Sequence, residues 1–336
     1  MPNPPSRPAA AAGAAVLVLL LGACGDDSAS GIGGGDAGTT WSAAADPLDT
    51  SGLVWAADGT VHLPDGSTIE TEQDIAAYVV AGPGAYVVPA DDDGSTGRLL
   101  LATPDGTVEE TGAQVDPATL RTSPDGRYLA FVDPATGEQD EYGTPVGTVV
   151  VVDTVEGEEV VRSAEGMGDP GSDDLADLYE DAEEPAVLGL TDTTAYVVGP
   201  DAVLAYDLAT GDATTAAGSA SEAYDADWFA ELRPEAALTN PAGTWTIVDP
   251  PTGDPVRLVP EGGGDPVATR VPGGGVYELD SWLDDETAVG GALDGQTDVL
   301  IGCSLPSGDC EPLPGVPPGA LLPVDRSGPA GPTVRR

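Results

Sequence analysis

The sequence predicts an all-β protein that follows a short N-terminal export region. Two observations support the β prediction: short runs of apolar and β-branched residues recur along the chain, and tight turns built on Asp and Gly separate them. A third observation is a Gly-containing turn motif that returns at roughly constant spacing, while helical periodicity is almost absent. Since four-stranded blades repeat at about 40–50 residues, this spacing predicts a β-propeller.

The N-terminal region has the features of an export signal. Pro8 to Ala23 is uncharged and contains the apolar run Val16 to Leu21, which is too short for a membrane-spanning helix of about 18 or more residues. The next motif, Leu21-Gly22-Ala23-Cys24, resembles the bacterial lipobox. The resemblance implies that residues 1–23 are a lipoprotein signal peptide and that Cys24 carries diacylglycerol and acyl chains such as palmitate. The alternative is an ordinary secretory signal with a chance cysteine.

Lipid attachment at Cys24 predicts an anchored rather than an integral membrane protein, since two or three acyl chains hold a soluble domain on a bilayer. Residues 24–45 are rich in Gly, Ser and Asp, a composition typical of a flexible tether. We therefore expect the folded domain to lie at the extracytoplasmic face of the cell membrane.

The charge balance excludes several classes of protein. The 336 residues contain 11 Lys+Arg and 58 Asp+Glu, for a formal net charge of −47. A nucleic-acid partner is excluded because binding to a polyanion depends on basic contacts to phosphates. The sequence contains no lysine, so Schiff-base chemistry on lysine is excluded as well. Acidity itself identifies no partner, since acidic residues also keep an exported surface soluble.

The body of the chain contains many short strands. Examples are Tyr78 to Val80, Leu99 to Leu101 and Val149 to Val152. Asp-Gly suits tight hairpins because both residues tolerate positive φ. This dipeptide occurs at Asp58-Gly59, Asp65-Gly66, Asp93-Gly94, Asp105-Gly106, Asp125-Gly126 and Asp294-Gly295.

A longer motif also repeats: an apolar strand that runs into Asp-x-x-x-Gly or a variant of it. Its glycines are Gly157, Gly211, Gly253 and Gly308, and Ser304 replaces the aspartate in the last copy. Their spacing fits propeller blades with insertions of different length. Two stacked sandwiches, the other all-β architecture considered, do not readily explain such a series.

Ser123 to Val132, followed by Asp133-Pro134-Ala135-Thr136-Gly137, resembles the blade signature of WD-repeat-like and TolB-like bacterial β-propellers. Weaker copies are Thr103 to Gly106 and Leu63 to Gly66. The resemblance implies a propeller of about six or seven four-stranded blades over residues 46–316. Six blades can be delimited, and the degenerate region 225–242 is the candidate for a seventh.

An acidic stretch interrupts the repeat. Residues 165–185 contain nine acidic residues and no basic one, which predicts an insertion between blades with a short helix near Leu175 to Asp181. The insertion is interpreted as a solvated loop, and the alternative is a site for calcium or a cationic partner. The tail, residues 317–336, is rich in Pro and Gly and is predicted to be disordered apart from a closing strand at Leu321 to Val324.

Two cysteines remain in the exported chain. Cys303 and Cys310 flank the turn Leu305 to Gly308, which predicts a disulfide across one hairpin. His62 is the only histidine and lies in a strand, so a zinc site built from His and Cys is not available and a Ser-His-Asp triad would depend wholly on it.

The sequence predicts a membrane-anchored lipoprotein whose β-propeller is a non-catalytic protein-interaction or scaffolding module with a protein partner in the cell envelope. Its alternative is a carbohydrate-active enzyme with paired carboxylates at the propeller mouth. Carboxylates are too abundant to identify such a pair, and aromatic residues, which line sugar sites, make up 5% of the chain. We predict no catalytic residues and no cofactor.

Overall fold

The computed structural model describes residues 39–44, 46–90, 96–181, 184–232, 238–249, 255–272, 277–294 and 297–325. These residues belong to one compact unit, Gly38–Arg336. Cys24 and the predicted signal peptide lie outside the described residues, as does most of the tether. Within the described part of the chain, no helix is long and apolar enough to cross a membrane.

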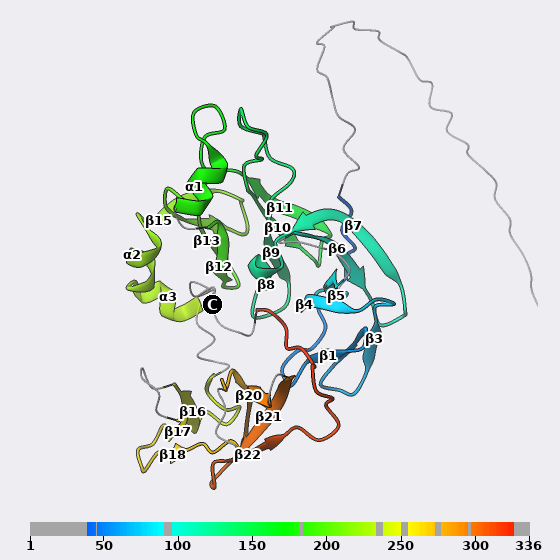
Figure 1. The fold of residues 1–336 in the computed structure, drawn as a ribbon, viewed down its shortest axis with the longest axis vertical. Coiled ribbons are helices and arrows are strands. Elements are labelled where there is room, and N and C mark those ends of the chain that lie inside the picture. The colour runs from blue at the N-terminus through cyan, green and yellow to red at the C-terminus, as the bar shows by residue number, and fades with distance from the viewer. Residues whose placement is uncertain are drawn as a thin grey trace, which may run out of the picture. The chain divides into compact units, whose positions relative to one another are not determined.

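The described residues form six antiparallel sheets that follow one another along the chain (Figure 1), and in each sheet neighbouring strands are consecutive in sequence. The strands of sheets 1 to 3 are β1 (Trp55–Ala57), β2 (Thr60–His62), β3 (Thr68–Glu70), β4 (Ile75–Ala81), β5 (Gly84–Pro89), β6 (Gly97–Ala102), β7 (Val108–Val115), β8 (Arg121–Thr122), β9 (Tyr128–Asp133), β10 (Thr148–Asp153) and β11 (Glu158–Ser163). Sheets 4 to 6 contain β12 (Ala186–Leu190), β13 (Thr194–Val198), β14 (Val203–Asp207), β15 (Ala213–Ala217), β16 (Trp245–Val248), β17 (Arg257–Pro260), β18 (Val267–Ala268), β19 (Ser281–Trp282), β20 (Thr287–Asp294), β21 (Thr297–Ser304) and β22 (Asp309–Pro312).

Two of the six sheets have three regular strands, and a single bridge adds a fourth strand position to each. Leu321 pairs with Ala56 of β1, and Thr239 pairs with Thr246 of β16. The first pairing joins the C-terminal segment, red in Figure 1, to the first sheet, in blue. The predicted closing strand is therefore confirmed at Leu321. A series of four-stranded meanders in which the end of the chain completes the first sheet is the architecture of a β-propeller.

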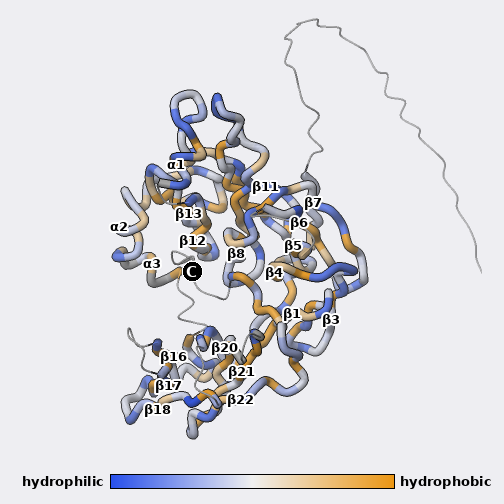
Figure 2. Tube along the Cα trace, viewed as in Figure 1, coloured by the Kyte–Doolittle hydropathy of each residue, from blue (hydrophilic) through white to orange (hydrophobic). Residues whose placement is uncertain are grey.

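Adjacent sheets pack face to face through alternate residues of the same strand. In β10, Val149 and Val151 belong to a core cluster shared with sheet 4, whereas Val150 and Val152 belong to one shared with sheet 2. Because successive side chains of a strand point to opposite faces, an all-apolar strand can serve two cores at once. This explains why β10 is an unbroken valine run, and in Figure 2 hydrophobic residues, in orange, follow the strands.

The meander order gives each sheet two distinct ends. Turns between the first and second strands and between the third and fourth lie at one end, here called the turn end. The remaining connections, including links between sheets, lie at the other, the link end. Neighbouring turns share the turn end, since the Gly82 amide donates to the Gly126 carbonyl at 2.8 Å. At the link end of sheets 3 and 4, the Leu175 amide donates to Asp140 Oδ2 at 2.9 Å.

The helices occupy connections at the link end. They are the 3-10 helix η1 (Pro117–Thr119), α1 (Leu175–Asp181), α2 (Ala220–Tyr224) and α3 (Asp227–Leu232). Helix α1 confirms the short helix predicted in the acidic insertion. Helices α2 and α3 pack through Ala223 and Phe229 against Leu188 and Val198 of sheet 4. Of the region 225–242 considered as a seventh blade, the described residues contribute α3 and Thr239 of sheet 5.

The repeated Asp-x-x-x-Gly motif forms the turn between the third and fourth strands. Asp153 Oδ1 accepts the amides of Val155 and Glu156, and Asp207 Oδ1 accepts two amides in the same way. Gly157, Gly211 and Gly308 close these turns with φ of 71°, 76° and 73°. The copy that contains Asp249 instead follows β16, the second strand of sheet 5 when Thr239 is counted. The motif therefore does not mark the same connection in every sheet, and the distances between its glycines are not a strict blade repeat.

Candidate functional site: the docked N-terminal segment

The last residues of the predicted tether and those that follow it are attached to the turn end of sheets 2 and 3. We call residues 39–44 and 46–48 the N-terminal strap. Three backbone hydrogen bonds hold it: Thr40 N to Thr111 O of β7 at 2.9 Å, Ala44 N to Thr154 O at 3.1 Å and Leu48 N to Gly82 O at 3.0 Å. The strap thus runs from the edge strand of sheet 2, past the last turn of sheet 3, to the first turn of sheet 2.

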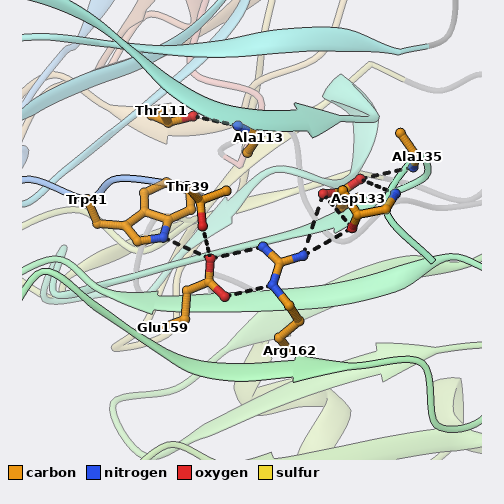
Figure 3. Close-up of polar contacts among 9 residues, drawn as sticks. Thr39, Trp41, Thr111, Ala113, Asp133, Ala135, Glu159 and Arg162 are labelled. Atoms are coloured by element: carbon orange, nitrogen blue, oxygen red, sulfur yellow. Dashed lines mark hydrogen bonds and ion pairs between the residues drawn. The ribbon is translucent and has the colours of Figure 1, made fainter. Parts of the chain in front are cut away.

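Trp41 anchors the strap between the two sheets. Its ring packs against Tyr86 and Phe131, with ring centroids 6.4 and 6.0 Å apart. The indole Nε1 donates a hydrogen bond of 2.9 Å to Glu159 Oε1, and Thr39 Oγ1 donates to the same oxygen at 2.7 Å (Figure 3). An apolar ring with a satisfied polar edge gives both affinity and a fixed orientation.

Arg162 pairs with the same carboxylate from the other side (Figure 3). Its Nε donates to Glu159 Oε2 at 2.7 Å and one terminal nitrogen donates to Oε1 at 2.9 Å, while the other lies 3.6 Å from the buried Asp133. These hydrogen bonds, with smaller contributions from Thr39 and Trp41, lower the pKa of Glu159 from 4.5 to about 2 although burial opposes the shift. The carboxylate that receives the strap is therefore ionised at any physiological pH.

A β-bulge places Glu159 and Arg162 on the same side of β11. Residues three apart in a regular strand face opposite ways. Here Val151 pairs with Val161 and Val152 pairs with Glu159, so Val160 is an extra residue in β11. The extra residue reverses the alternation locally and lets Glu159 and Arg162 form a two-point ion pair.

The strap also forms one wall of a groove of about 520 Å³. The opposite wall is the turn between β6 and β7, and Pro83 from the first turn of sheet 2 closes one side. Ser42 Oγ spans the walls with a 3.1 Å hydrogen bond to Glu109 Oε2. The residues that line the groove are Ser42, Ala43, Ala44, Asp46, Leu48, Pro83, Leu101, Thr103, Pro104, Asp105, Thr107 and Glu109.

Polar residues also gather around β8, the first strand of sheet 3. Arg121, at 5% exposure, donates to the carbonyls of Ala118 and Leu120, and Asp325 accepts a hydrogen bond from Thr122. Burial is the largest cause that raises the pKa of Asp116, whose side chain caps η1 by accepting the Ala118 amide. Asp116 and Asp325 thus have structural contacts, with η1 and with Thr122. The catalytic carboxylate pair of the alternative hypothesis stays a prediction.

The disulfide predicted from sequence is confirmed. Cys303 and Cys310 face each other across β21 and β22 and are bonded, with an S–S distance of 2.01 Å. The hairpin they close is also held from sheet 5, because Arg270 donates from two nitrogens to Asp309 Oδ1 at 3.0 and 2.8 Å. The disulfide therefore secures a hairpin of sheet 6 that also contacts the segment after β18.

The remaining residues singled out in the sequence have structural contacts. His62 stacks on Trp55, its cross-strand partner, with ring centroids 3.7 Å apart. In the acidic insertion, Tyr179 OH accepts the Gly147 amide and donates to the Met167 carbonyl. The described residues contain no group of three or more His, Cys, Asp or Glu placed to hold a metal ion. Calcium binding stays a prediction, as does lipid attachment at Cys24.

Sequence reasoning missed the strap, because it assigned residues 39–44 to the tether. One signal was present: Trp41 is a large aromatic residue isolated in a stretch of Gly, Ala, Ser, Thr and Asp. A lone tryptophan in such a context indicates a docking point. Its partners could not be found in the same way, since Glu159 is one of 58 acidic residues.

Comparison with known proteins adds little to the geometry. No known family and no curated protein matches the sequence. Among solved structures the chain is similar to TolB from Acinetobacter baumannii, at 11% identity over 82% of this chain and 67% of that chain, with a TM-score of 0.37. It is also similar to a puromycin-hydrolyzing peptidase from Mycobacterium tuberculosis, at 17% identity and a TM-score of 0.27, over 81% of this chain and 40% of that chain. TM-scores this low carry no functional argument, and the fold assignment depends on the sheets themselves.

Proposed function

We propose that this protein is a membrane-anchored extracytoplasmic lipoprotein whose β-propeller is a non-catalytic protein-interaction or scaffolding module. The observation that carries the proposal is the docked strap. A short linker separates Cys24 from Thr39, and at Thr39 and Trp41 the chain is tied to the folded domain by hydrogen bonds to Glu159, a partly buried carboxylate that is ion-paired with Arg162. These contacts fix the residue at which the flexible linker ends, so they would set how many residues separate the folded domain from a lipid anchor at Cys24.

The linker length supports the same proposal. Residues 25–38 have the composition of a flexible chain, whose root-mean-square span for this length is roughly 20 Å. The strap would then keep the edge of sheets 2 and 3 close to the bilayer. A lipid anchor contributes about 0.8 kcal/mol per buried methylene, so two acyl chains suffice without a spanning helix.

The disulfide supports export. Structural disulfides form in oxidising compartments and are rare in the cytosol, where thiols are kept reduced. Cys303 and Cys310 are bonded, which accords with a domain that folds outside the cytoplasm.

Metabolic labelling with an alkyne analogue of palmitate tests the anchor. The wild-type chain should take up the label and sediment with membranes, and Cys24→Ala should lose both properties. Cys303→Ala with Cys310→Ala is the matched control, because it removes the other cysteines and should keep the label. A wild-type chain that carries no label, or a Cys24→Ala variant that keeps it, would contradict the anchor.

Crosslinking in intact cell envelopes tests the interaction role. A module that binds a protein should yield the same crosslinked partner in repeated experiments, and Cys24→Ala should lower the yield because the domain is no longer concentrated at the membrane. Absence of any reproducible partner from the wild-type protein would count against the interaction role and would leave the anchor unaffected.

A further inference from the structure

The groove between the strap and the β6–β7 turn has a strongly one-sided charge. Asp46 extends from the strap, and Asp105 and Glu109 extend from the opposite wall, and all three residues are exposed. None of the twelve lining residues is basic. Three carboxylates around one concave surface, with no cation among its lining residues, favour a cationic occupant.

The floor of the groove is apolar. Leu101 has 3% exposure, and the other apolar residues of the lining are Ala43, Ala44, Leu48, Pro83 and Pro104. Lysine and arginine bury their methylene stems along apolar surface while their charged groups remain at its rim. The combination of an apolar floor and acidic walls therefore matches such side chains better than it matches a metal ion, which needs converging oxygen ligands.

Two of the three hydroxyl groups that line the groove, those of Ser42 and Thr103, already donate within the protein. Thr103 Oγ1 donates to Asp105 Oδ1 at 2.6 Å, and Ser42 Oγ donates to Glu109 Oε2. Anionic or hydroxyl-rich ligands would find few donors there, whereas a guanidinium or ammonium group brings its own. The groove volume lies within the range of about 300–1,000 Å³ that ligand sites occupy.

We propose that this groove binds an extended basic segment, rich in arginine or lysine, of a partner protein. This inference rests on the proposed interaction function and specifies the chemistry of the partner. A protein segment fits better than a small amine because each exposed ion pair contributes little by itself, so useful affinity needs several at once. Since the strap forms one wall, the same segment that ties the domain to its tether shapes the binding surface.

Fluorescence anisotropy with a labelled Arg-Gly-Arg-Gly-Arg-Gly peptide tests the proposal on the full chain in detergent. The groove variant combines Asp46→Asn, Asp105→Asn and Glu109→Gln. Asparagine at position 105 keeps the oxygen that caps the turn, where Asp105 Oδ1 accepts the Thr107 amide. The control variant makes the same change in net charge elsewhere, through Asp192→Asn, Asp212→Asn and Glu286→Gln, which are all exposed.

At a salt concentration of about 150 mM, where charges at a distance are screened, the groove variant should bind the peptide at least about fivefold more weakly and the control less than about twofold. Equal weakening by both variants, or no binding to the wild type, would overturn the proposal. A peptide with a photoreactive phenylalanine analogue gives an independent readout. Its crosslinks should map to residues 42–48 or 103–109, and crosslinks confined to other segments would overturn the proposal. Neither measurement depends on lipid attachment, so its failure is distinct from failure of the proposed anchor.

Discussion

Trp41 Nε1 donates a 2.9 Å hydrogen bond to Glu159 Oε1 although 118 residues separate the two in sequence. Glu159 is oriented for this contact by its ion pair with Arg162, which in turn depends on the bulge in β11. A local irregularity of one strand thus decides where the N-terminal strap meets the folded domain. The contact also fixes one wall of the acidic groove, since Ser42 follows directly.

Replacing Trp41 should detach the strap without unfolding the sheets. Trp41→Ala removes the contacts with Tyr86 and Phe131 and the hydrogen bond to Glu159, and since Trp41 is only partly buried we expect a loss of about 2 kcal/mol in the free energy of unfolding. Urea denaturation measures the loss, and faster limited proteolysis within residues 39–48 reports the detachment. Thr40→Ala is the control, because the backbone amide of Thr40 makes its contact with Thr111. A strap that stays protected in Trp41→Ala would contradict this role.

The ion pair at Glu159 predicts a specific pH dependence. Its folded-state pKa is about 2 against an ordinary value of 4.5, so the carboxylate stabilises the fold fully above pH 4.5 and loses this effect as the pH falls toward 2. With allowance for solvent screening, Glu159→Gln should cost about 2 kcal/mol at pH 7 and progressively less below pH 4.5. Urea denaturation of both proteins between pH 7 and pH 3 measures the difference, and a constant difference over this range would refute the assignment.

Two glycines with the same backbone conformation should respond differently to alanine. Gly66 and Gly211 have φ of 85° and 76°, and either substitution incurs the cost of a left-handed residue, about 1–2 kcal/mol. A Cβ at position 66 would meet nothing within 4 Å, whereas at position 211 it would lie 2.6 Å from the Val160 carbonyl oxygen of the neighbouring sheet. Gly211→Ala should therefore be more destabilising than Gly66→Ala by about 1–3 kcal/mol in thermal or urea denaturation. Equal losses would show that sheets 3 and 4 do not pack closely at this turn.

Features that depend on local chemistry could be predicted from the sequence. Turns such as Ser123 to Gly126 were predictable because the aspartate caps its own turn, and Asp125 Oδ1 indeed accepts the Arg127 amide and the Ser123 hydroxyl. The disulfide was predictable because Cys303 and Cys310 are close in sequence and flank one turn. Strand pairs within each sheet followed from the same short-range order.

Features that depend on contacts between distant segments could not be predicted. The bulge at Val160 could not be located from the sequence, because the run Glu158 to Arg162 has paired glutamates and paired valines in place of a clear alternation, and without the bulge Glu159 and Arg162 would face opposite ways. The strand pair that the Asp249 turn connects could not be read from the sequence, because the single bridge between Thr239 and Thr246 supplies the first strand position of that sheet. Such a short pairing has no periodicity to detect.

A half-buried carboxyl at the start of sheet 6 gives the last prediction. Burial, with a smaller contribution from Glu278, raises the pKa of Asp280 from 3.8 to about 6. An acid whose pKa is raised on folding favours the folded state below pH 3.8, and that contribution is lost as the pH rises through 6. Asp280→Asn keeps the side-chain shape without the charge, so it should stabilise the protein by about 1–2 kcal/mol at pH 7.5 and by nothing below pH 4. Glu278→Gln should give a smaller gain at pH 7.5, because it removes only the weaker cause. Urea denaturation at the two pH values decides the matter, and a loss of stability in Asp280→Asn at pH 7.5 would mean that the ionised carboxylate has a compensating partner.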